Sequence, residues 1–154
     1  MILRSGNMVC ISLQSGYFSS KSGDEGEGER PMEIATRHFV RPEYMNHHNS
    51  LYAGYISEWI TEAAFIGMAK VMGRTSHFVL AAVRGINVTR SVYTGSVLEL
   101  GYEVKKIGTT SVELTVEGRD FLSGDMHCEG SVVFVNVDDE GKKTPHGLEP
   151  VAVS

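Results

Sequence analysis

Two glutamates and two hydroxyl residues are set at helical spacing within the otherwise apolar stretch 51–72. Ser57 and Glu58 are followed one turn later by Thr61 and Glu62. Residues four positions apart lie on the same side of a helix, so these side chains form a short polar window. A buried carboxylate is costly unless it is paired or used, and a carboxylate is a suitable general base. The window is therefore the first candidate for chemistry.

The stretch 51–72 is predicted to be one helix that is buried on nearly all sides. Outside the polar window, Lys70 is its only strongly polar side chain. Asn49 or Ser50 is the predicted N-cap, because a short polar side chain can accept a hydrogen bond from a free amide of the first turn. Gly73 is predicted to end the helix in the left-handed conformation.

Strands are predicted on both sides of this helix. A β-branched and aromatic run at 33–41 precedes it, and four segments with alternating or apolar patterns follow at 79–89, 98–105, 112–117 and 131–137. This order predicts an α+β fold in which an antiparallel sheet wraps around one long central helix. A sheet this small leaves an edge strand exposed, so we expect the chain to form at least a dimer.

Length, charge and cysteine content exclude several classes of protein. The 154 residues suit one domain, and the net charge of −5 argues against a nucleic-acid partner held by bulk charge. The two cysteines are too few for a disulfide framework and suit a reducing cytosol. No apolar run is long enough to span a membrane, and no secretory signal is recognised. We therefore expect a cytoplasmic protein without a membrane partner.

Three regions are predicted along the chain. Residues 1–31 contain a stretch rich in Ser, Gly, Glu and Lys, which predicts a disordered extension. The domain is predicted at 32–144, and 145–154 is predicted to be an irregular tail.

The run from Met45 to Ala64, MNHHNSLYAGYISEWITEAA, resembles a segment of the hotdog-fold acyl-CoA thioesterases. In that family an Asn, a small turn and a Gly-Gly pair precede Trp-Ile-Asp-Glu-Ala-Ala. The segments 82–88, 95–100 and 108–112 are similar to later strands and a hairpin of the family. The resemblance covers about 33–142 and implies a hotdog fold, a homo-oligomer, and cleavage of acyl-CoA to free acid and CoA.

The resemblance also implies roles for residues around the start of the helix. Asn46 matches the family's Asn and would orient a water or bond the thioester carbonyl, unless it only bonds its own loop backbone. Ala53 replaces the first Gly of the pair, and Gly54 keeps the second. Helix N-termini present unpaired amides, so the Gly54 amide is a candidate oxyanion donor. Alternatively, this glycine only permits close packing of the helix on the sheet.

The family's acidic residue falls on Thr61, which is a departure from its pattern. Glu62 is the next residue of the family's Asp-Glu pair, and Glu58 lies one turn earlier. Either glutamate is a candidate base, although a shift of one residue turns a side chain by about 100°. Both could instead be paired within the dimer, and Thr61 could hold the water itself.

Basic residues near the strand ends are candidates for binding the phosphates of CoA. Arg90 and Lys106 are the preferred pair, with Thr109 in the neighbouring hairpin, and solvated surface charge is the alternative for each. The wider set of candidates is Arg74, Arg84, Arg90, Lys105 and Lys106.

No metal site and no resident cofactor are expected, and coenzyme A would enter as part of the substrate. His47 and His48 are adjacent in a loop and project apart, and no ligand spacing completes a site with His38. Three other functions are carried forward: a non-catalytic acyl-CoA-binding protein, a hotdog hydratase or dehydratase, and a structural oligomer. The sequence leaves the acyl chain and the choice among dimer, tetramer and hexamer open.

Overall fold

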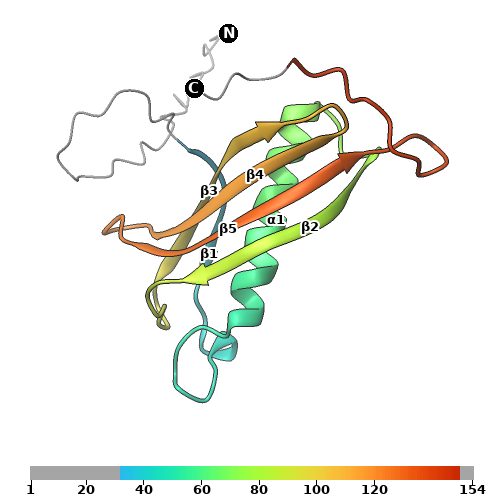
Figure 1. The fold of residues 1–154 in the computed structure, drawn as a ribbon. Helices are drawn as coiled ribbons and strands as arrows, with labels where there is room; N and C mark the ends of the chain where they lie inside the picture. The colour runs from blue at the N-terminus through green and yellow to red at the C-terminus, as the bar shows by residue number, and fades with distance from the viewer. Residues whose placement is uncertain (1–31, 150–154) are drawn as a thin grey trace, which may run out of the picture.

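The structure, a computed structural model, describes residues 32–149 (Figure 1). The predicted extension at 1–31 and the last part of the predicted tail, 150–154, lie outside the described residues. No helix within residues 32–149 is long and apolar enough to cross a membrane.

One α-helix, one short 3-10 helix and five strands make up the described residues. Their bounds, in chain order, are β1 (Glu33–Phe39), a short 3-10 helix (Pro42–Tyr44), α1 (Ala53–Met72), β2 (Phe78–Val88), β3 (Val97–Ile107), β4 (Ser111–Asp120) and β5 (Met126–Asn136). All five predicted strands overlap observed ones. β5 begins well before the predicted position, because Glu129 and Gly130 interrupt the apolar pattern on which the prediction depended.

The strands form one antiparallel sheet in the spatial order β1-β3-β4-β5-β2. The sheet curves around α1, which packs on one of its faces (Figure 1). The predicted α+β plan, a sheet wrapped around one long helix, is confirmed. β1 and β2 are the two edge strands, and this order gives α1 one flank near β1 and another near β2.

The core lies between α1 and the concave face of the sheet. The helix supplies one buried side, consisting of Ile56, Trp59, Ile60, Ala63, Ala64, Gly67 and Met68. Gly67 sets how closely the helix approaches the sheet, because a Cβ there would stand 2.7 Å from Cγ of the Tyr102 ring on β3. A larger residue at Gly67 would push helix and sheet apart.

The opposite side of α1 is exposed, so the prediction of a helix buried on nearly all sides is wrong for a single chain. Glu58, Glu62, Phe65 and Ile66 are all exposed. The sheet covers only one side of the helix, and residues 32–149 form no second layer over the other. Phe65 and Ile66 are apolar nonetheless, which indicates a surface suited to burial against another molecule.

The predicted N-caps, Asn49 and Ser50, are also wrong. The helix begins at Ala53, and its N-cap is Tyr52, which makes no side-chain capping hydrogen bond. Asn49 instead adopts a left-handed φ of 58°, and Ser50 is bonded to Asn46 in the preceding loop. Both polar residues are used to close that loop.

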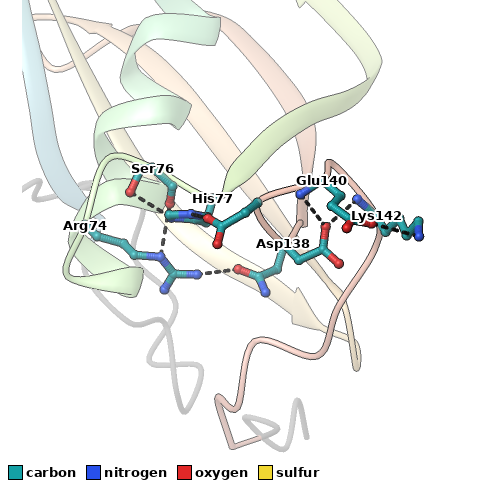
Figure 2. A network of polar contacts seen from close by, with 8 residues as sticks. Arg74, Ser76, His77, Asp138, Glu140 and Lys142 are labelled. Atoms are coloured by element: carbon teal, nitrogen blue, oxygen red, sulfur yellow. Dashed lines mark hydrogen bonds and ion pairs between the residues drawn. The ribbon is translucent and has the colours of Figure 1, made fainter.

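The carboxyl end of α1 agrees with the prediction. Gly73 has a φ of 68°, and its amide donates to the carbonyl of Ala69. Beyond it, Arg74 donates to the carbonyl of Ser76 at 3.0 Å and to the side-chain oxygen of Asn136 at the end of β5 (Figure 2). The buried Asn136 amide donates in turn to Thr144 O at 3.0 Å. This network fastens the segment after β5 to the loop after α1.

Candidate active site

Asn46 lies in a closed loop directly before α1. An isolated bridge joins the residues that flank the loop, and the Asn46 side-chain oxygen accepts hydrogen bonds from the amides of His48 (2.8 Å) and Ser50 (3.2 Å). The Asn46 amide nitrogen donates to Ser50 Oγ at 3.1 Å. A primary amide has two N–H groups, so the loop occupies the oxygen and leaves one N–H for a ligand.

Gly54 is the second residue of α1 and is exposed. Within residues 32–149, no acceptor is bonded to the amides of Ala53 and Gly54, whereas the amide of Tyr55 donates to Tyr52 O at 3.0 Å. The helix therefore presents two open donors at its positive end. The glycine does not serve packing on the sheet, since a Cβ at Gly54 would strike the ring of Tyr52.

Ser57, Thr61 and Phe65 follow one another along α1 at four-residue spacing. Thr61 Oγ1 donates to its own helix, with carbonyl acceptors at Ser57 (3.0 Å) and Glu58 (2.8 Å). Phe65 continues the row and contacts Phe78 at the start of β2, with ring centroids 5.2 Å apart. Because residues four apart share a face, Thr61 lies on the flank of the helix that is directed toward β2.

Glu62 lies on the other flank, near β1. The Glu62 carboxylate is 3.5 Å from Nε2 of His38 on β1, and the His38 ring stacks on Trp59 with centroids 4.2 Å apart. Burial lowers the pKa of His38, while the charges of Glu62 and Glu58 act in the opposite direction. Glu62 is turned by about 100° from Thr61, whereas Glu58, three residues before Thr61, is its neighbour on the helix surface.

The preferred phosphate-binding pair is not brought together in one chain. Arg90 follows β2, near the start of β5, and forms an ion pair with Asp125 at 3.0 Å. Lys106 and Thr109 belong to the β3–β4 hairpin, which lies beside the far end of β5, where the amide of Asn136 donates to Thr110 O. The two candidate groups therefore stand at opposite ends of the sheet.

The other basic candidates have partners within the chain. Arg84 and Lys105 approach the buried carboxylate of Glu113, at 3.9 and 3.4 Å. A hydrogen bond from Ser131 is the main cause that lowers the pKa of Glu113, and the two cations add to it. Arg74 is committed to the network of Figure 2.

The described residues contain no group of three or more His, Cys, Asp or Glu that could hold a metal ion. His47 and His48 contact each other with ring centroids 3.9 Å apart and are exposed at the loop surface.

Three residues near the site were not anticipated in these roles. Ser50 holds the amide of Asn46, His38 pairs with Glu62, and the Tyr52 ring covers Gly54. The short interval between Asn46 and Ser50 could have indicated a closed loop. No local sequence signal links His38 to Glu62, because β1 and α1 meet only in the folded chain.

A comparison with known protein families finds one match. The Thioesterase superfamily profile matches residues 48–121. This range includes α1, β2, β3 and β4 and leaves out β1 and β5. No curated protein matches the chain.

Solved structures with a similar fold include an acyl-CoA hydrolase from Staphylococcus aureus, in complex with butyryl coenzyme A, coenzyme A and coenzyme A disulfide. It is 29% identical with a TM-score of 0.66, and the match covers 71% of this chain and 66% of that one. This chain thus spans just under two thirds of the staphylococcal protein. An apo hexameric acyl-CoA thioesterase is 28% identical with a TM-score of 0.65, covering 71% and 72% of the two chains.

A more distant similarity is to a hexameric thioesterase from Yersinia pestis, at 21% identity and a TM-score of 0.66. This match covers 74% of this chain and 94% of that one. At this identity the likeness concerns the fold, which is the hotdog fold expected from the sequence.

Two further structures of the staphylococcal hydrolase carry alanine in place of an asparagine and of an aspartate. In that protein the two positions are separated by the same interval that separates Asn46 from Thr61.

Proposed function

We propose that this chain, which belongs to the thioesterase superfamily and has the hotdog fold, hydrolyses acyl-CoA to a carboxylic acid and coenzyme A. One observation carries the proposal: the amides of Ala53 and Gly54 are open at the start of α1, directly after the loop that holds Asn46. Preorganised N–H groups at a helix N-terminus stabilise the negative charge that develops on a thioester oxygen during attack.

In the proposed reaction the thioester carbonyl oxygen accepts a hydrogen bond from the Gly54 amide. Asn46 supplies a second N–H, since its oxygen is already occupied by the loop. A water oxygen then attacks the carbonyl carbon, and the carbon–sulfur bond breaks. The leaving thiolate of CoA takes up a proton, and the acyl group departs as the free acid.

Activation of the water is the weak step in this chain. A threonine hydroxyl can hold a water but does not remove its proton at neutral pH, whereas a carboxylate can. Glu62 is turned toward β1, where its carboxylate lies 3.5 Å from Nε2 of His38, and Glu58 is exposed beside Thr61 on the helix surface. Gly54 and Thr61 of one chain are separated by about 10 Å of helix, so we assign the Thr61 hydroxyl of a second copy the role of holding the attacking water, and we expect slow turnover.

The active unit is proposed to be a homodimer or a larger homo-oligomer. β2 is an edge strand with several exposed apolar side chains, among them Val79 and Val83, and Phe65 of the exposed helix face packs beside it. Pairing of β2 with a second copy would bury these residues and continue the sheet. Thr61, on the same flank, would then lie close to the interface.

Three expectations from the sequence are kept as part of this proposal. Lys106 and Thr109 are candidates for binding the CoA phosphates, because they lie on an exposed hairpin. Coenzyme A is part of the substrate, and no resident cofactor takes part. The reaction is placed in the cytoplasm, where acyl-CoA substrates and reduced thiols coexist.

Steady-state hydrolysis of an acyl-CoA panel, with the released thiol as the readout, tests the proposal. The sharpest variant is Asn46→Asp, because it keeps the oxygen that closes the loop and removes the N–H donor. We expect a loss of about 10²-fold in kcat with an unchanged melting temperature. No release of CoA from any substrate by the folded wild-type protein would overturn the proposal.

A non-catalytic acyl-CoA-binding protein is the second candidate, and the threonine at position 61 favours it. In that case saturable binding of acyl-CoA, measured by calorimetry, would occur without release of CoA. Thr61→Asp would then leave the rate at background.

A further inference from the structure

A serine, a histidine and an aspartate meet beyond the carboxyl end of α1. Ser76 and His77 belong to the loop between α1 and β2, and Asp139 follows β5. Ser76 Oγ lies 3.0 Å from Nδ1 of His77 (Figure 2), and Nε2 of the same ring lies 2.7 Å from Oδ1 of Asp139. A nucleophile within reach of a base that a third group orients is the arrangement found in enzymes that form acyl intermediates.

The carboxylate of Asp139 decides which ring nitrogen of His77 is the base. An ionised carboxylate only accepts hydrogen bonds, so Nε2 carries a proton and donates to Asp139. In the neutral ring Nδ1 then holds a lone pair, to which the hydroxyl of Ser76 donates. The imidazole therefore faces the serine with its basic nitrogen.

The backbone of this loop is held on both sides. Arg74 donates through Nε to Ser76 O at 3.0 Å, and the amide of Val137 donates to His77 O at 2.9 Å. His77 itself has a φ of 62°, in the left-handed region that residues other than glycine adopt only rarely. These contacts fix the loop while leaving the hydroxyl and the imidazole to each other.

The same loop offers open backbone donors. Within residues 32–149, no acceptor is bonded to the amides of Ser76 and His77. An amide beside a nucleophile can donate to the oxygen that becomes negative when an acyl carbonyl is attacked. Ser76, His77 and Asp139 are all exposed, so a small ester reaches the serine from solvent.

We propose that Ser76 is a nucleophile that accepts an acyl group from activated esters and thioesters, with His77 as its base. Oγ attacks the carbonyl carbon while its proton passes to Nδ1. The bond from that carbon to the leaving oxygen or sulfur then breaks, the leaving group departs with the proton, and an ester remains on Ser76. This site is separate from the one at Gly54, because the 20 residues of α1 place about 30 Å between them.

The test treats the full chain with p-nitrophenyl acetate and follows acetylation of each serine by peptide mass spectrometry. Ser123 is the control within the same molecule, because it is also exposed but its hydroxyl contacts the amide of Asp125. We expect Ser76 to react about tenfold faster than Ser123. His77→Asn removes the base and suits the left-handed region, so it should slow Ser76 to the rate of Ser123. Asp139→Ala should slow it by a smaller factor.

Two results would overturn the inference. One is equal acetylation of Ser76 and Ser123 in the folded wild type. The other is a fast reaction at Ser76 that persists in a folded His77→Asn protein, with folding checked by thermal melts. An unchanged rate in Asp139→Ala would overturn the assignment of the aspartate. None of these measurements uses the release of CoA, so the inference stands or fails independently of the proposed function.

Discussion

The two flanks of α1 differ in the contacts that their side chains make within the chain. On the β1 flank, Lys70 forms an ion pair with Glu33, and the Glu62 carboxylate lies 3.5 Å from Nε2 of His38. On the β2 flank, the row that contains Thr61 ends in an exposed phenylalanine, Phe65, beside an apolar edge strand. The β1 flank is covered by polar contacts to β1, and the β2 flank leaves apolar side chains exposed.

This difference explains why charge alone is a poor guide to the reactive side of the helix. Carboxylates are the usual candidates for a general base in a sequence. In the structure, however, the Glu62 carboxylate lies beside His38 of β1. The flank with neutral hydroxyls lies nearer the edge where a second copy would bind. The predictions below test whether the flanks differ in function as they do in structure.

A charge placed on the β2 edge is expected to have the largest effect. Val83→Asp would put a carboxylate among side chains that a second copy buries, and unpaired buried charges are strongly unfavourable. We expect dissociation to monomers by sedimentation and loss of thioesterase activity. Leu122→Asp is the matched control, because Leu122 is apolar and 89% exposed but lies on the β4–β5 turn. If both variants stay oligomeric, β2 is not the interface.

Gly54→Ala is expected to reduce activity by about 10²-fold, because the added methyl group displaces the Tyr52 ring and disturbs the open amides beneath it. The double variant Gly54→Ala with Tyr52→Ala removes the clash and should recover part of the rate. Thermal melts measure whether either variant is destabilised. An activity equal to wild type in the single variant would contradict the role of this amide.

The fold was predictable because each element carries its own periodicity. The alternation at 98–105 and 112–117 and the glycine after the helix were sufficient to predict strands and a helix end. The resemblance around Asn46 gave the candidate site residues, and their roles stay predictions. The N-cap prediction failed because Asn49 and Ser50 have side chains that suit a cap equally well. Both residues instead belong to the loop that the bridge between its two ends closes.

The pairing of Glu62 could not be predicted from local sequence. Its partner, His38, is on a strand that meets the helix only through the sheet. The separation of Arg90 from Lys106 was also hidden from local sequence. The order of the strands in the sheet decides which loops lie at the same end of the sheet. Tyr52 was passed over since a tyrosine beside a glycine has no distinctive spacing.

The smallest expected effect concerns the β1 flank. Burial lowers the pKa of His38 below its usual 6.5, so the unfolded chain binds a proton more readily than the folded chain just below that pH. Stability therefore rises with pH through this window and falls as the pH drops below about 6.5. His38→Gln should remove this dependence, which amounts to a few degrees in melting temperature at most.

The carboxylate of Glu62 opposes the effect of burial on His38. Glu62→Gln should therefore lower the imidazole pKa further, as measured by NMR titration, and leave kcat close to the wild-type value. A large loss of kcat in this variant would mean that the β1 flank takes part in the reaction.

The most direct test of the account is kcat/KM for Thr61→Asp on an acyl-CoA that the wild type hydrolyses. The new carboxylate would stand on the β2 flank and would supply the general base that the proposed mechanism lacks. We predict a rise of tenfold or more, with Thr61→Asn, which has no base, showing none. A folded Thr61→Asp protein with no gain, together with inactivation by Glu62→Gln, would contradict the account and move the chemistry to the β1 flank.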